Sequence, residues 1–135
     1  MKYKNILIIM IITILFTGCS AFKKDELLNE GKLALEKHEY TKAQELLSQA
    51  LTADSTNENA RSMYIQAVKM KDAAEYEEKK NYDKAIACLE AIENLKGGSS
   101  DIKNEASKKK KELIKLNEEY KKAQEESKEN AKDAS

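Results

Sequence analysis

Two stretches of sequence decide the fold, GKLALEKHEYTKAQELLSQA at 31–50 and AAEYEEKKNYDKAIACLEAI at 73–92. In each stretch small or apolar residues recur at steps of 9, 3, 4 and 3 positions. Steps of three and four residues fit the period of an α-helix and do not fit the alternation of a strand. The two stretches therefore predict two similar helical hairpins. The matching residues are Gly31, Tyr40, Ala43, Leu47 and Ala50 in the first stretch, and Ala73, Tyr82, Ala85, Leu89 and Ile92 in the second.

The rest of the chain also favours helices. Its 135 residues are 36% charged and contain no proline, which is typical of long uninterrupted helices. Capping-box pairs, Thr41 with Gln44 and Ser55 with Glu58, predict two helix starts, and the glycine pair at 97–98 predicts a helix end. The fold class is all-α. The expected helices are 25–38, 41–53, 57–80, 83–96 and 101–128.

The first hairpin resembles a tetratricopeptide (TPR) repeat at Leu27, Gly31, Tyr40, Ala43, Leu47 and Ala50. The resemblance implies two TPR-like helical hairpins over 24–99 and a long C-terminal capping helix over 100–128, with 129–135 as a frayed or disordered tail. The two hairpins are offset by 42 residues, from Gly31 to Ala73, whereas the family repeats every 34 or so. About two extra helical turns must therefore lie within 57–80. A generic bundle of helical hairpins is the alternative.

The N-terminal segment is typical of an export signal. Lys2 and Lys4 precede an apolar run at 6–16, which is too short to span a bilayer comfortably and leads into small residues. The sequence LFTGC at 15–19 resembles the lipobox of bacterial lipoproteins. The resemblance implies that 1–18 is a cleaved signal peptide, that Cys19 carries a covalent diacylglyceryl lipid, and that 19–23 is a lipidated tether. An ordinary signal peptide, or an uncleaved anchor with a chance cysteine, is the alternative.

These two resemblances imply a location and a function. The lipid anchor predicts attachment to the extracytoplasmic face of a bacterial membrane, inner or outer, and the repeats imply an adaptor that binds a protein or peptide partner. The TPR resemblance assigns partner binding to the first helix of each pair, at Asn29, Lys32, Lys71 and Glu75, where the lysines suit an acidic segment. The alternative is a structural lipid-anchored spacer, or a coiled-coil assembly subunit that uses the C-terminal helix. That helix either packs on the repeats or extends as an arm.

The remaining chemistry of the chain is sparse. Its 24 basic and 24 acidic residues balance, which argues against a nucleic-acid partner. The single histidine, His38, is expected near a helix C-terminus, and Cys88 is expected in the core. One histidine and one further cysteine do not make a zinc site. We therefore expect no enzyme activity, no metal, no small-molecule substrate and no cofactor apart from the lipid on Cys19.

Overall fold

The computed structural model describes residues 23–133 of the chain, and the expected all-α fold is confirmed for them. Residues 1–22 and 134–135 lie outside the described part, and so does the signal peptide predicted at 1–18. The first helix occupies residues 23–36. It is followed by α2 (Tyr40–Ala53), α3 (Glu58–Glu78), α4 (Tyr82–Glu93) and α5 (Ser100–Asp133).

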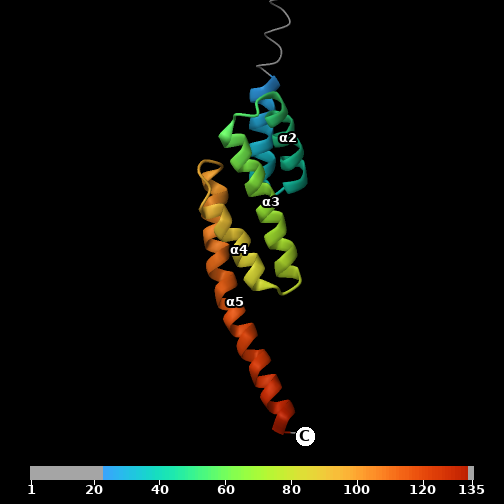
Figure 1. The fold of residues 1–135 in the computed structure, drawn as a ribbon, viewed down its shortest axis with the longest axis vertical. Coiled ribbons are helices and arrows are strands. Elements are labelled where there is room, and N and C mark those ends of the chain that lie inside the picture. The colour runs from blue at the N-terminus through green and yellow to red at the C-terminus, as the bar shows by residue number, and fades with distance from the viewer. Residues whose placement is uncertain (1–22, 134–135) are drawn as a thin grey trace, which may run out of the picture.

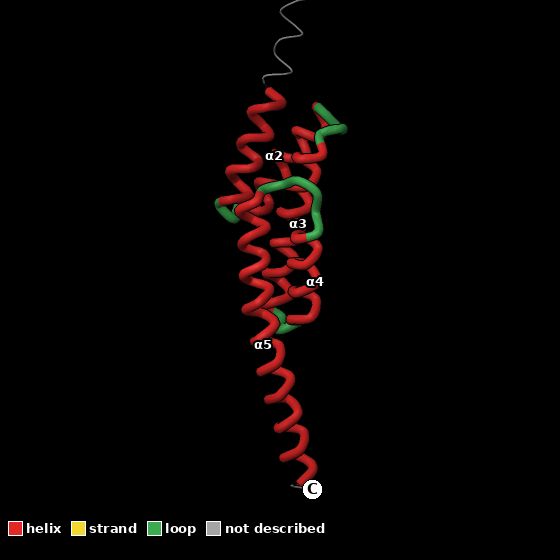
Figure 2. Tube along the Cα trace, turned by 90° about the vertical axis from the view of Figure 1, so that its left-hand side faces the viewer, coloured by secondary structure: helices red, strands yellow, loops and turns green. Residues whose placement is uncertain are grey.

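Successive helices pack side by side, α2 on α3, α3 on α4 and α4 on α5 (Figure 1). The long helix α3 is shared between the two hairpins, because α2 lies beside its first half and α4 beside its second half. Short loops connect the helices, and α5 continues past the turn between α3 and α4 (Figure 2). The two extra turns expected in the middle of the chain are accommodated by the length of α3.

One hydrophobic core runs through all the helices, and it contains most of the repeated positions. Gly31 shows why a residue without a side chain is needed there, because an added Cβ would lie 2.7 Å from Cγ of the buried Leu47. The first half of α5 belongs to this core, so the capping role predicted for the helix is confirmed for that half. The core residues include Leu35, Ala43, Leu47, Met63, Ala67, Ala73, Ala85, Cys88, Leu89, Ile92, Ile102, Ala106 and Leu113.

The two predicted capping boxes are wrong. The N-cap of α2 is Glu39 and makes no side-chain cap bond, so Thr41 lies inside the helix. The N-cap of α3 is Asn57, whose side-chain oxygen accepts a hydrogen bond from the Ala60 amide at 2.9 Å. Asparagine is as good an N-cap as serine and sits closer to the first buried residue, so it displaces Ser55 from that role.

The last helix is longer than the sequence pattern predicts. It extends to Asp133, whereas we expected the helix to end at residue 128 and the chain to fray from 129. The extra residues, ENAKD at 129–133, contain no glycine or proline, and lysine, glutamate and alanine are good helix formers. The side chains at 121–132 are all exposed, so this segment is helical without any support from the core.

The hairpin turns repeat at the level of the backbone. His38 and Lys80, 42 positions apart like the hairpins themselves, both adopt the left-handed conformation, with φ of 63° and 54°. Each follows a helix end with the same pair of hydrogen bonds. His38 N–H donates to Leu35 and Glu39 N–H to Ala34, while Lys80 N–H donates to Glu77 and Asn81 N–H to Tyr76. Both helices therefore end in a Schellman motif, which normally places glycine at this position.

Replacing Lys80 by glycine is expected to stabilise the protein. A side chain in the left-handed conformation costs about 1 kcal/mol, while glycine adds entropy to the unfolded chain, so we expect a net gain of about 0.5 kcal/mol for Lys80→Gly. Urea unfolding measures the difference. The control is Lys79→Gly, where φ is −82° and glycine relieves no strain, so stability should fall. Equal effects of the two substitutions would contradict the assigned turn.

Candidate functional site

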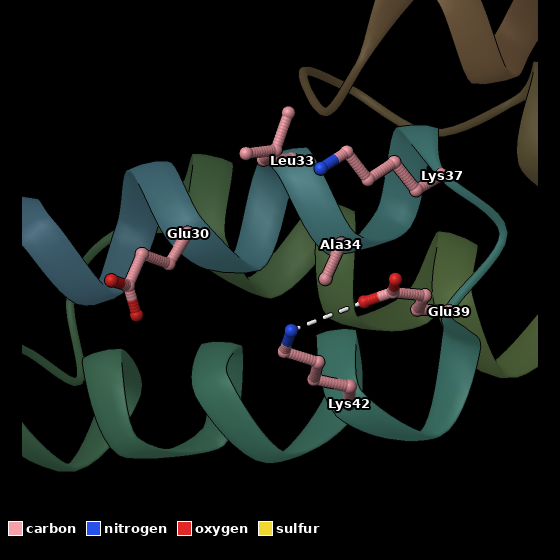
Figure 3. Close-up of a pocket in the computed structure, with 6 residues that line it drawn as sticks. All are labelled: Glu30, Leu33, Ala34, Lys37, Glu39 and Lys42. Atoms are coloured by element: carbon pink, nitrogen blue, oxygen red, sulfur yellow. Dashed lines mark ion pairs between the residues drawn. The ribbon is translucent and has the colours of Figure 1, made fainter.

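Three adjoining hollows surround the turn between the first helix and α2. The first, of about 190 Å³, lies between the two helices, and Ala34 points toward the Glu39–Lys42 ion pair in it (Figure 3). The second, of about 400 Å³, shares Glu39 and Lys42 with the first and adds Lys71 from α3. The third, of about 170 Å³, shares Tyr40 with the second and reaches α5. We call the residues that line these hollows the turn groove.

The left-handed turn at His38 shapes this surface. Because the first helix ends there and α2 begins at Tyr40, five consecutive residues, 38–42, line the second hollow. Nε2 of His38 lies 2.9 Å from Oε2 of Glu105 on α5. A carboxylate only accepts hydrogen bonds, so Nε2 carries the proton and donates it. The turn is thereby tied to the capping helix, a contact that joins residues 67 positions apart.

The turn groove combines apolar surface with mixed charge. The Tyr40 ring is half-buried, and burial, reinforced by the negative charge of Glu105, raises the pKa of its hydroxyl to about 12. The hydroxyl therefore stays protonated and is a neutral hydrogen-bonding group. Lys42 pairs with Glu39 at 3.2 Å, and Lys109 pairs with Glu77 at 2.9 Å. The third hollow adds the apolar side chains of Met70, Ala73, Ala74 and Leu89.

The four residues predicted to bind a partner do not meet in one hollow. Lys71 lines the second hollow of the turn groove. Asn29 lines a separate hollow of about 360 Å³ on the first helix, beside three acidic residues. Lys32 is exposed, with its ammonium 3.7 Å from the Glu36 carboxylate one turn along the same helix. Glu75 is exposed on α3.

The other members of the turn groove were not predicted from the sequence. His38 was expected near the end of a helix and Tyr40 was one of the repeated positions, but neither was expected to lie with Lys42 and Lys71. The useful signal was the run HEYTK at 38–42, which separates two strong helical patterns without glycine. Contacts to α5, such as the one with Glu105, join distant segments and leave no local pattern.

Three sequence-based expectations concern a metal site, Cys88 and the membrane anchor. Between residues 23 and 133 no three His, Cys, Asp or Glu side chains are grouped so that they could hold a metal ion. Cys88 is 7% exposed, and burial raises the pKa of its thiol, so the core role predicted for it is confirmed. None of the helices described is both long and apolar enough to cross a membrane. The predicted lipidation residue, Cys19, lies outside the described residues.

An ion pair fixes the end of the domain that is nearest in sequence to Cys19. Nζ of Lys24 lies 2.6 Å from Oδ2 of Asp54 in the loop before α3. The hydrogen bond from Lys24, together with those from the Thr56 hydroxyl and amide, lowers the pKa of the Asp54 carboxyl to about 2. The first helix is thus attached to the loop between α2 and α3 at its start.

This ion pair predicts an acid-dependent stability. The pKa of Asp54 is lower in the folded chain than in the unfolded one, so its stabilising contribution is present above about pH 4 and is lost as the pH falls toward 2. Asp54→Asn should therefore unfold at a lower temperature than the wild type at pH 6, and the difference should shrink by pH 2. Thermal unfolding across this range measures it. A difference that is constant with pH would contradict the assignment.

Comparison of the chain with models of protein families, with curated proteins and with solved structures found no match in any of the three. The function proposed below therefore rests on the residues of this chain and on the geometry of the described part.

Proposed function

We propose that this protein is a lipid-anchored adaptor at the extracytoplasmic face of a bacterial membrane, and that it binds an acidic segment of a protein or peptide partner in the turn groove. The lipobox-like sequence at 15–19 supports the anchor. The folded domain is already helical at residue 23, so only a few residues separate it from Cys19. At about 3.5 Å per extended residue, the proposed tether holds the domain within roughly 20 Å of the bilayer.

The observation that carries the binding proposal is the make-up of the second hollow. His38, Lys42 and Lys71 bring three basic side chains to it, and Glu39 is the acidic residue in its lining. The half-buried Tyr40 joins this hollow to the apolar third hollow. A carboxylate beside Lys71 and a neighbouring apolar side chain in the third hollow would match this arrangement. Such mixed sites use charge for specificity and apolar contact for affinity.

The anchor is tested by intact-mass analysis of the protein extracted from membranes. We expect a chain that begins at Cys19 and carries a diacylglyceryl group, and we expect Cys19→Ala to remain unprocessed. A mature chain without lipid would overturn the anchor and leave the binding proposal standing.

The binding site is tested by affinity capture from detergent-solubilised membranes with Lys71→Glu. The variant would replace the proposed attraction between Lys71 and a carboxylate of the partner by repulsion, which should weaken partner capture about tenfold or more. The matched control is Lys115→Glu, which makes the same charge change at an exposed position of α5 and should leave capture unchanged. If the two variants capture a partner equally well, the turn groove is not the binding site.

The second candidate function is a structural spacer or coiled-coil subunit that acts through the C-terminal helix. The length of α5 favours it, since 34 residues at about 1.5 Å each make a helix of roughly 50 Å, longer than α4 by 22 residues. Removal of residues 123–135 separates the candidates. Partner capture persists if the turn groove binds the partner and disappears if the end of α5 does.

A further inference from the structure

The C-terminal end of α5 carries its charges in an ordered pattern. We call residues 121–133, the last part of α5, the arm; it begins beside the turn between α3 and α4, and α5 continues past that turn (Figure 1). With helical spacing, the uncharged residues Ala123, Gln124, Ser127 and Asn130 fall on one face of the arm, which we call the uncharged stripe. The stripe continues the face by which α5 packs on the body, where Leu113 is buried.

The last contacts of that face with the body show where the stripe becomes free. The Tyr120 ring meets the Tyr82 ring edge-on at 5.6 Å between centroids, and the Asn117 side-chain amide donates to Asp83 at 2.7 Å. Lys121 also reaches Asp83, at 3.0 Å. Gln124 still lines a hollow beside residues 79–83 of the turn between α3 and α4, and the residues of the stripe, Ala123 to Asn130, are exposed.

The two edges of the stripe carry opposite charge. Glu119 and Glu126 follow one edge, and Lys121 and Lys128 follow the other, each pair seven residues apart and therefore aligned along the helix. Flanking charges of this kind set the choice and direction of a helical partner. The edges therefore restrict which helix can lie on the stripe.

Pairing of two arms with each other is disfavoured in both directions. In an antiparallel pair like edges meet, so that Glu126 of one copy faces the acidic edge of the other. In a parallel pair opposite edges meet, so the charges match. The α5 helix of the second copy would then have to run beside the α5 helix of the first, in the space that α4 already occupies. A second copy of this chain is thus a poor occupant.

We propose that the arm binds a single helix of a different protein, antiparallel to α5 and in line with α4. The contact face of the partner helix carries small residues, because Ala123 and Ser127 of the arm let the two backbones approach closely. The partner helix presents a row of basic residues to Glu119 and Glu126 and a row of acidic residues to Lys121 and Lys128. This surface lies on α5 and is separate from the turn groove, so the proposal does not depend on binding by the turn groove. It specifies the second candidate function, in which the C-terminal helix binds the partner.

Two designed helical peptides test the proposal against the full chain in detergent. Both have alanine at the contact positions. The matched peptide has lysine and glutamate rows that complement the arm in the antiparallel direction, and the swapped peptide has the rows exchanged. Fluorescence anisotropy should show the matched peptide binding at least about tenfold more tightly. Exchanging the edge charges of the arm, with Glu126→Lys and Lys128→Glu together, should reduce or reverse this preference.

The stripe itself is tested by Ser127→Glu, which should abolish binding of the matched peptide while retaining the helix, because glutamate favours helices more than serine does. Lys122→Gln makes the same change of charge on the opposite face and should leave binding unchanged. Equal binding of the two peptides, or binding of neither, would overturn the proposal. So would a dimer of the full chain in sedimentation analysis that Ser127→Glu dissociates, because a second copy would then occupy the stripe.

Discussion

Replacement of Gln66 by alanine is expected to lower the free energy of unfolding by about 3 kcal/mol or more. The Gln66 side chain is completely buried in α3. Its amide donates to the Ser99 carbonyl at 2.9 Å and its oxygen accepts from the Ser99 N–H at 2.8 Å. Alanine would leave the buried Ser99 N–H without a partner, at a cost of about 1–3 kcal/mol, and would also create a cavity. The Ser99 carbonyl would lose one of its two hydrogen bonds and keep the one from the Lys103 N–H at 3.2 Å.

Urea unfolding followed by circular dichroism measures this loss. Gln49→Ala, at an exposed position of α2, is the matched control and should change stability by less than about 0.5 kcal/mol. A second variant, Gln66→Leu, fills most of the space but makes no hydrogen bond, so it should also be destabilised strongly. If Gln66→Leu were as stable as the wild type, the hydrogen bonds would not be what holds this region together.

Gln66 is one of three polar residues on α3 that together hold the loop before α5. Asn59 accepts a hydrogen bond from Gly98 N–H at 2.8 Å, and the Ser62 hydroxyl donates to the Lys96 carbonyl at 2.6 Å. The glycine is required, because Gly98 has φ of +84° and an added Cβ would lie 2.6 Å from the Gln66 oxygen. These three residues lie in the first half of α3. The first half of α3 therefore holds the start of α5.

The fold was largely predictable because its core follows a local rule. Apolar and small residues at steps of three and four define a helix face, and the positions chosen on that rule, such as Leu47, Ala85 and Leu89, are buried. Gly31, another of the repeated positions, packs tightly against the Leu47 side chain. Each of these inferences needed only residues within one hairpin, where sequence spacing fixes which side chains share a face.

The polar features of the structure were not predictable in the same way. The Gln66–Ser99 hydrogen bonds join residues 33 positions apart, and the His38–Glu105 contact joins residues 67 apart. Neither has a local sequence pattern, and a buried glutamine looks like any other polar residue in a helix. The left-handed turns were missed for a similar reason, since His38 and Lys80 occupy positions where glycine is the usual signal. The candidate site was therefore only partly found, through Lys71.

Truncation of the chain at Gly98 is expected to unfold it. Ile102 and Leu113 are each 1% exposed, and burial of each contributes about 1.5–3 kcal/mol. Truncation would also remove Ser99 and with it the bonding partner of Gln66. The combined loss of about 5 kcal/mol or more is comparable to the whole stability of a typical small domain. Far-UV circular dichroism of the truncated chain should show much less helix than its residues form in the full-length fold, a loss that exceeds the removal of α5.

Truncation after Lys122 is the matched comparison, because it removes only the exposed end of α5. Residues 123–132 are exposed and lie outside the core, so we expect the free energy of unfolding to change by less than about 0.5 kcal/mol. A stable, cooperatively unfolding protein that ends at Gly98 would show that α5 is an accessory helix. If the two truncations differ as expected, the first half of α5 belongs to the domain and its second half is a separable arm. Binding by the turn groove and binding by the arm can then be assayed independently.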